Sequence, residues 1–137
     1  MRHYILTGHA RISEGLASAA ELILGQKIKF YNAYVSEEAF FLDEIRKEIA
    51  DCPSGDDIII MTDVLGGSVN NEMMQFLKCR NVHLICGTNL PLVIGMLMMD
   101  ETKETSEMIK ECISEAKEGI CYCNMWKEQE AGSLDDF

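Results

Sequence analysis

The sequence predicts a doubly wound α/β fold built on a mostly parallel sheet. Short apolar runs alternate with segments whose apolar residues recur at helical spacing, and residues 58–61 are apolar at every position, as a strand covered on both faces must be. No repeat or linker divides the 137 residues into two units. Strands separated by helices favour a parallel sheet with helices on both faces.

Several segments have the apolar and β-branched character of strands. They are residues 4–7, 28–34, 58–61, 82–86 and 120–125. Each of the first four leads into a loop and then a helical segment, so these four are the expected parallel strands. The last one follows a helix that stops at Gly119.

The expected helices are marked by their apolar stripes and by their ends. The first carries Leu16, Ala20, Ile23 and Leu24 on one face and ends at Gly25. Of the others, Ser36 begins the second, Ser68 caps the third, Pro91 takes the first position of the fourth, and Gly119 ends the last. Residues 1–126 then form one domain, and the acidic residues 127–137 form a disordered tail.

Charge and hydropathy exclude several classes of protein. The formal net charge of −11 would repel a nucleic-acid backbone, so no nucleic-acid partner is expected. The longest apolar stretch, residues 91–99, is too short to cross a bilayer. The first residues lack the apolar segment and cleavage site of a signal peptide, and a cytoplasmic protein is therefore expected.

The six cysteines do not indicate a disulfide framework or a metal site. A cytoplasmic chain of this size needs no disulfides, so reduced thiols are expected. Cys121 and Cys123 are separated by one residue, which is not the spacing of a redox or zinc pair. We expect neither a metal nor a cofactor.

Three segments fall at the carboxyl ends of predicted strands, where an open parallel sheet places its site. They are Gly8–His9 after the first strand, Asp63–Ser68 after the third, and Gly87–Pro91 after the fourth. Each leads into a helix, whose first amide N–H groups and positive dipole end favour an anion. Together they predict a phosphate site.

His9 is the residue expected to carry the phosphoryl group, because a neutral imidazole nitrogen is both a good nucleophile and an adequate leaving group. Asp63 on a neighbouring strand end would hold one ring N–H and leave the other nitrogen open. Gly66 and Gly67 would let backbone amides approach the phosphoryl oxygens, and Ser68 would add a hydroxyl donor.

Simpler interpretations of the same residues stay open. A histidine in a loop is often just solvated, Asp63 could cap a turn, and Gly66–Gly67 could mark a tight loop. Ser68 is first of all a candidate helix cap. His3 and His83 lie within predicted strands, and we expect them on sheet faces or edges rather than at the site.

Three segments also carry a resemblance to a known family. Thr7–Ala10, Thr62–Ser68 and Gly87–Pro91 resemble, in order and spacing, the three site loops of the mannose-family enzyme IIA domain of the bacterial sugar phosphotransferase system. The resemblance covers about residues 3–125. Many relatives have a glycine and a proline where this chain has Ala10 and Val69.

The resemblance implies a phosphotransferase that works through a phosphohistidine. The histidine matching His9 takes phosphate from the phosphocarrier protein HPr and passes it to a IIB component, and the membrane permease IIC/IID acts indirectly. The aspartate matching Asp63 supports this histidine, the serine matching Ser68 lies beside it, and the loop Asn89, Leu90 and Pro91 faces the partner. The family forms a homodimer in which the last strand, here residues 120–125, pairs antiparallel and is exchanged between subunits.

Other functions remain possible at this point. One is the phosphotransfer subunit of a phosphoenolpyruvate-dependent dihydroxyacetone kinase, and another is a regulatory IIA-like module that passes nothing on. An unrelated flavodoxin-like binding domain is a remoter alternative. The sugar cannot be read from this chain, because in the family it is bound by separate membrane components.

Overall fold

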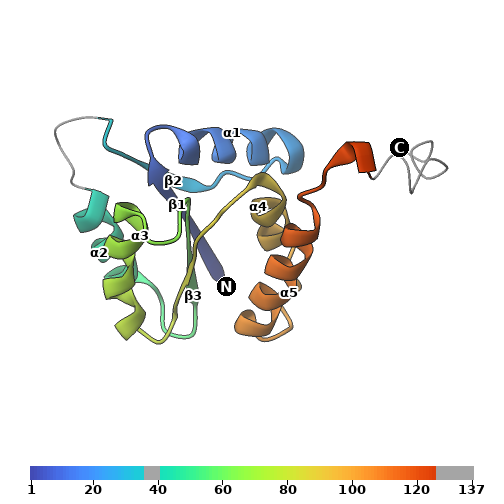
Figure 1. The fold of residues 1–137 in the computed structure, drawn as a ribbon. Coiled ribbons are helices and arrows are strands. Elements are labelled where there is room, and N and C mark those ends of the chain that lie inside the picture. The colour runs from blue at the N-terminus through green and yellow to red at the C-terminus, as the bar shows by residue number, and fades with distance from the viewer. Residues whose placement is uncertain (36–40, 126–137) are drawn as a thin grey trace.

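The computed structural model describes residues 1–35 and 41–125, and its centre is a parallel sheet (Figure 1). The described strands are β1 (Arg2–His9), β2 (Lys29–Ala33), β3 (Asp57–Thr62) and β4 (Val82–Ile85), in the order β2-β1-β3-β4. All three pairings are parallel. The predicted α/β fold with a parallel sheet is therefore confirmed.

Helices cover both faces of this sheet. The helical elements are α1 (Ile12–Leu24), α2 (Phe41–Asp51), α3 (Ser68–Met73), the 3₁₀-helix η1 (Met74–Lys78), α4 (Leu90–Leu97) and α5 (Thr105–Glu118). In Figure 1, α2 and α3 lie on one side of the strands, and α4 and α5 lie on the other. The core of the second side also includes α1. Among the described residues, no helix is both long and apolar enough to span a bilayer.

Strand β3 is buried on both faces, which explains its unbroken apolar sequence. Ile59 and Met61 belong to the core formed with α1, α4 and α5. Ile58 and Ile60 belong to the core formed with α2, α3 and η1. Successive side chains of a strand point to opposite faces, so this one strand joins the two cores.

The strand order reverses between β1 and β3, and this reversal positions the site. From β1 the chain goes to the outer strand β2 and then returns to β3 on the other side of β1. Thr7 lies opposite Thr62 in the β1–β3 pairing, so the carboxyl ends of the two strands are side by side. Ligands of open α/β sheets bind at such a point.

Two details of the predicted core and sheet are wrong. The buried face of α1 consists of Ser13, Ala17 and Ala20, whereas Ile23 is 56% exposed and lines a groove between α1, α4 and α5. In the single chain, residues 120–125 are not a strand: no described strand pairs with them, and 123–125 form a short helical turn. The predicted helix start at Ser36 and the tail 127–137 lie outside the described residues.

Candidate functional site

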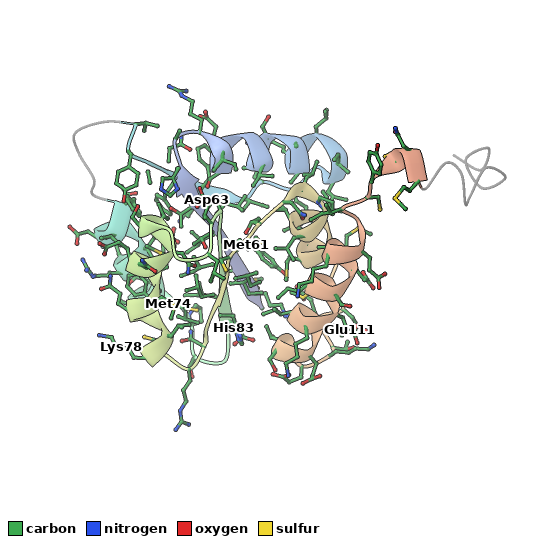
Figure 2. The ribbon with its side chains drawn as sticks, in the orientation of Figure 1. Met61, Asp63, Met74, Lys78, His83 and Glu111 are labelled. Carbon is green, nitrogen blue, oxygen red and sulfur yellow. The ribbon has the colours of Figure 1, made fainter. Side chains whose placement is uncertain are left out.

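His9 and Asp63 meet at the edge where the strand order reverses. His9 is the last residue of β1 and Asp63 directly follows β3, so the parallel pairing brings both to the same edge of the sheet. The distance from His9 Nδ1 to Asp63 Oδ2 is 2.8 Å. Figure 2 shows Asp63 at this edge, near α1, and His83 well away from it.

The Asp63 carboxylate is held by three N–H groups. Its Oδ2 accepts hydrogen bonds from the ring and from the backbone N–H of His9 (2.9 Å), and its Oδ1 accepts one from the Val64 N–H (3.0 Å). Burial alone would raise the pKa of Asp63, but the hydrogen bonds from His9 outweigh it and lower this pKa below its ordinary value. Asp63 is therefore ionised at neutral pH.

This ionised partner fixes the tautomer of His9. A carboxylate can only accept hydrogen bonds, so in the neutral imidazole Nδ1 carries the ring proton and Nε2 has the lone pair. The side chain of Asp63 is only 8% exposed, whereas that of His9 is 43% exposed. The arrangement is an imidazole with one nitrogen fixed on a buried carboxylate and the other available for nucleophilic attack.

Ser68 does not cap α3, contrary to the prediction. The N-cap is Gly67, whose backbone is extended, and no side chain caps this helix start. Because Ser68 already lies within the first turn, its hydroxyl points elsewhere. Its Oγ accepts a hydrogen bond from the Tyr34 hydroxyl (2.8 Å) and lies 3.4 Å from His9 Nε2.

The two glycines before Ser68 shape the loop beside the imidazole. Gly66 has a φ of +76°, a conformation that favours glycine. A Cβ added to Gly67 would lie 3.5 Å from His9 Cε1. The Gly67 N–H donates to the Val64 carbonyl (3.1 Å), so this particular amide already has an acceptor.

Gly8 allows the carboxylate to approach the backbone of β1. A Cβ added there would lie 3.0 Å from Asp63 Cγ and 2.8 Å from Ile12 Cγ2. Both distances are shorter than real Cβ contacts normally are, and Asp63 is fixed by its hydrogen bonds. The absence of a side chain at position 8 is therefore a condition for the His9–Asp63 contact.

Tyr34 also belongs to the site, although no sequence pattern indicated a role for it. Strand β2 ends at Ala33, and Tyr34 follows it with a φ of +63°, which costs a bulky residue on the order of 1–3 kcal/mol. Its ring centroid lies 5.5 Å from that of His9. The strand order could have revealed this residue, because β2 is the neighbour of β1 and ends beside His9.

The loop after β4 has other local roles. Asn89 caps α4, because its side-chain oxygen accepts the Leu92 N–H at 3.0 Å. Helix α4 begins at Leu90, so Pro91 takes its second position rather than its first. Leu90 and Pro91 line the apolar groove of about 500 Å³ that also includes Ile23.

The other histidines lie away from this edge. His3 Nε2 is 2.9 Å from Asp56 Oδ2, and His83 Nε2 is 3.6 Å from Asp57 Oδ1. Asp56 and Asp57 stand at the beginning of β3, whereas Asp63 follows its end. His3 and His83 are therefore on the sheet, as predicted, at the opposite end from His9.

Fold and site together define a doubly wound α/β domain in which a half-exposed histidine, held by a buried carboxylate, lies where the strand order reverses. The sequence model of the family described as "PTS system fructose IIA component" matches residues 3–134. The chain belongs to this family, whose members are IIA components of the phosphotransferase system. The resemblance to IIA domains inferred from the three loops is confirmed.

The same fold occurs in solved structures of other proteins. A candidate phosphoenolpyruvate-dependent sugar phosphotransferase system permease from Klebsiella pneumoniae is 41% identical with a TM-score of 0.81, covering 90% of this chain and 91% of that one. The mannose/sorbose-specific IIA subunit from Enterococcus faecalis is 20% identical with a TM-score of 0.69, covering 88% of this chain and 92% of that one. No curated protein matches the sequence.

Gly8→Ala should disrupt the contact between His9 and Asp63. The new methyl group would displace the carboxylate or α1, and we expect the free energy of unfolding to fall by about 1–3 kcal/mol. Chemical denaturation measures this change. Gly15→Ala is the matched control, because a Cβ at this position in α1 meets nothing within 4 Å, and it should leave the protein as stable or stabilise it.

The lowered pKa of Asp63 predicts a loss of stability in acid. The folded state favours the ionised carboxylate, so this contribution is complete above the unfolded pKa of about 4 and is lost as the pH falls through the lower folded pKa. One group contributes at most about 1.4 kcal/mol per pH unit. Denaturation between pH 2 and pH 6 should give a shallower acid-side slope for Asp63→Asn than for the parent, and equal slopes would contradict the linkage.

Proposed function

We propose that this chain carries a phosphoryl group on His9 Nε2, which it accepts from phospho-HPr and passes to a IIB component. The observation that supports this most directly is the 2.8 Å contact of His9 Nδ1 with Asp63, which leaves Nε2 on a half-exposed ring. Membership of the IIA component family fits the same chemistry. The permease IIC/IID would act after IIB, and the chain itself would work in the cytoplasm.

The proposed transfer uses charge that the site already holds. The Nε2 lone pair forms a bond to phosphorus, and the bond from phosphorus to the donor breaks with its electron pair going to the donor atom. The imidazole keeps its Nδ1 proton and becomes positively charged. The ionised Asp63 stabilises this charge at 2.8 Å, as a buried carboxylate does for an imidazolium in other histidine pairs.

The phosphoryl group would lie between the imidazole and the start of α3. Ser68 offers a hydroxyl 3.4 Å from Nε2, and the first amides of a helix have no acceptor within the helix itself. Gly66 and Gly67 add no side chain that would fill this space. Gly66, Gly67 and Ser68 are the proposed phosphate-binding residues. Gly67 contributes by lacking a side chain rather than by donating its N–H.

The surroundings of His9 suit a protein partner better than a free sugar. Several large apolar side chains near the site are exposed, the most exposed being Leu65 at 78%. The others are Ile12, Tyr34, Val35 and Val64. They come from the segments that follow β1, β2 and β3, so they lie at the same edge of the sheet as His9. Exposed apolar side chains grouped in this way are typical of a surface that docks a protein. The loop Asn89–Pro91 would extend the same surface toward IIB.

Substitution of His9 tests the proposed carrier directly. After incubation with phosphoenolpyruvate, enzyme I and HPr, we expect an acid-labile, base-stable phosphoryl label on the parent and none on His9→Gln, because glutamine has no nucleophilic nitrogen. Radiolabel retained on the chain after gel separation measures this. Label on His9→Gln, or an unlabelled parent beside active carriers, contradicts the proposal.

Two further measurements sharpen this test. Asp63→Asn keeps the nucleophile but loses the anionic partner, so labelling should slow by about 10- to 1,000-fold while circular dichroism stays unchanged. Purified IIB should then remove the label from the parent. A label that persists beside active IIB would favour the regulatory alternative, and transfer to a dihydroxyacetone kinase alone would favour the kinase subunit.

We also propose that two copies of the chain pair through residues 120–125. Ile120, Tyr122 and Met125 are exposed apolar side chains of this segment, and β4 is an edge strand of the described sheet with one unpaired side. An exchanged antiparallel strand would cover both. Sedimentation should give twice the chain mass of 15.4 kDa, and Tyr122→Asp should move it toward one chain. The single-chain mass for the parent contradicts this pairing.

A further inference from the structure

The Tyr34 hydroxyl lies at the site but takes no part in docking or in the transfer step described above. Tyr34 follows β2 directly, at the sheet edge where His9 ends β1. Its hydroxyl donates to Ser68 Oγ at 2.8 Å, and its ring lies beside the imidazole at a centroid distance of 5.5 Å. The residue is 58% exposed, so burial does not explain why a tyrosine adopts a left-handed backbone here.

The hydrogen bonds from Tyr34 to Asp63 all run in one direction. Asp63 accepts a hydrogen bond from His9 Nδ1, so in the neutral imidazole Nε2 has a lone pair and no proton. Ser68 Oγ lies 3.4 Å from Nε2 and can form a hydrogen bond to this lone pair only as a donor. The Tyr34 hydroxyl donates into the oxygen of Ser68. Each hydroxyl in such a chain polarises the next one, which makes the Ser68 proton a better donor.

We propose that Tyr34 is a positioning residue for phosphoryl transfer, whose hydroxyl directs the Ser68 proton toward His9 Nε2 and the phosphoryl oxygens. This inference rests on the proposed function of His9. A serine hydroxyl rotates freely about its C–O bond unless a neighbour fixes it. Because Tyr34 donates to one lone pair of Ser68 Oγ, the hydroxyl proton of Ser68 is directed away from Tyr34 and toward the imidazole.

During the transfer this proton changes its acceptor but stays on Ser68. When the Nε2 lone pair forms its bond to phosphorus and the donor atom leaves with its electron pair, Nε2 can no longer accept a hydrogen bond. The Ser68 hydroxyl then donates to a phosphoryl oxygen, which carries the negative charge of the transferred group. Tyr34 continues to donate to Ser68 Oγ, and no proton passes between the two hydroxyls.

Tyr34→Phe separates this role from docking, because it keeps the ring and removes the hydroxyl. With phospho-HPr as donor, the rate constant at saturation should fall roughly 3- to 10-fold, as expected for the loss of one hydrogen bond, with KM within about 2-fold of the parent. In a Ser68→Ala background the same substitution should have no further effect. Tyr31→Phe, which removes a hydroxyl on β2 that donates to Glu48 at 2.8 Å, is the matched control and should leave the rate unchanged.

Two further measurements do not depend on HPr. They therefore distinguish an error in the proposed phosphoryl donor from an error in the role of Tyr34. Phosphoramidate, a small phosphoryl donor that needs no docking surface, should label Tyr34→Phe more slowly than the parent by a similar factor. In the unphosphorylated protein, the ¹⁵N resonance of His9 Nε2 should move in Tyr34→Phe and not in Tyr31→Phe.

The contrary results are equally specific. An unmoved Nε2 resonance together with parental rates toward phosphoramidate overturns the role of Tyr34. A raised KM for phospho-HPr with an unchanged rate constant also overturns it, since that result assigns the residue to docking. If the parent takes phosphate from phosphoramidate but not from phospho-HPr, the proposed partner is wrong, and the Nε2 resonance and the phosphoramidate rates still decide the role of Tyr34.

Discussion

The hydrogen bond from His9 Nδ1 to Asp63 Oδ2 is the constraint on which the site depends. It gives the imidazole a single tautomer and fixes which nitrogen is presented outward. It is possible because β1 and β3 are parallel neighbours that end side by side, and because Gly8 has no Cβ in the path of the carboxylate. The two cores position these strands from opposite faces, and β3 contributes to both.

The site also concentrates the unusual backbone of the chain. Two non-glycine residues, Ala10 and Tyr34, have positive φ in the described residues, and they follow the two adjacent strands β1 and β2. Ala10 is tied to β2 by its N–H, which donates to the Ala33 carbonyl at 2.9 Å. Strain of this kind persists where the surrounding structure holds it, and it gathers at functional sites. Here it turns the chain sharply away from both strand ends, so that His9 and Tyr34 remain at the edge of the sheet.

The sequence was sufficient for the fold and for the central pair, and the reasons are physical. Alternating strands and helices leave few topologies, and the carboxyl ends of parallel strands share one edge, which brings His9 and Asp63 together. The sequence was insufficient where the conformation of a segment depends on residues that are distant in the chain. Ser68 looks like a cap, but helix α3 begins one residue earlier than a cap would require. Residues 120–125 look like a strand, yet a strand forms only against a partner. Tyr34 has no local pattern at all, because its role comes from the order of the strands.

The separation of His9 and Asp63 along the chain has a consequence for biosynthesis. The two residues are 54 positions apart, and Ser68 is 59 positions from His9. In a nascent chain that has not yet closed the β1–β3 pairing, the imidazole has neither its carboxylate nor its hydroxyl, and it is an ordinary solvated histidine. Contacts this distant form late, after the cost of closing the loop has been met. The contacts of His9 with Asp63 and Ser68 are therefore a property of the completed molecule, and under the proposed function unfinished or misfolded copies would not take up phosphate.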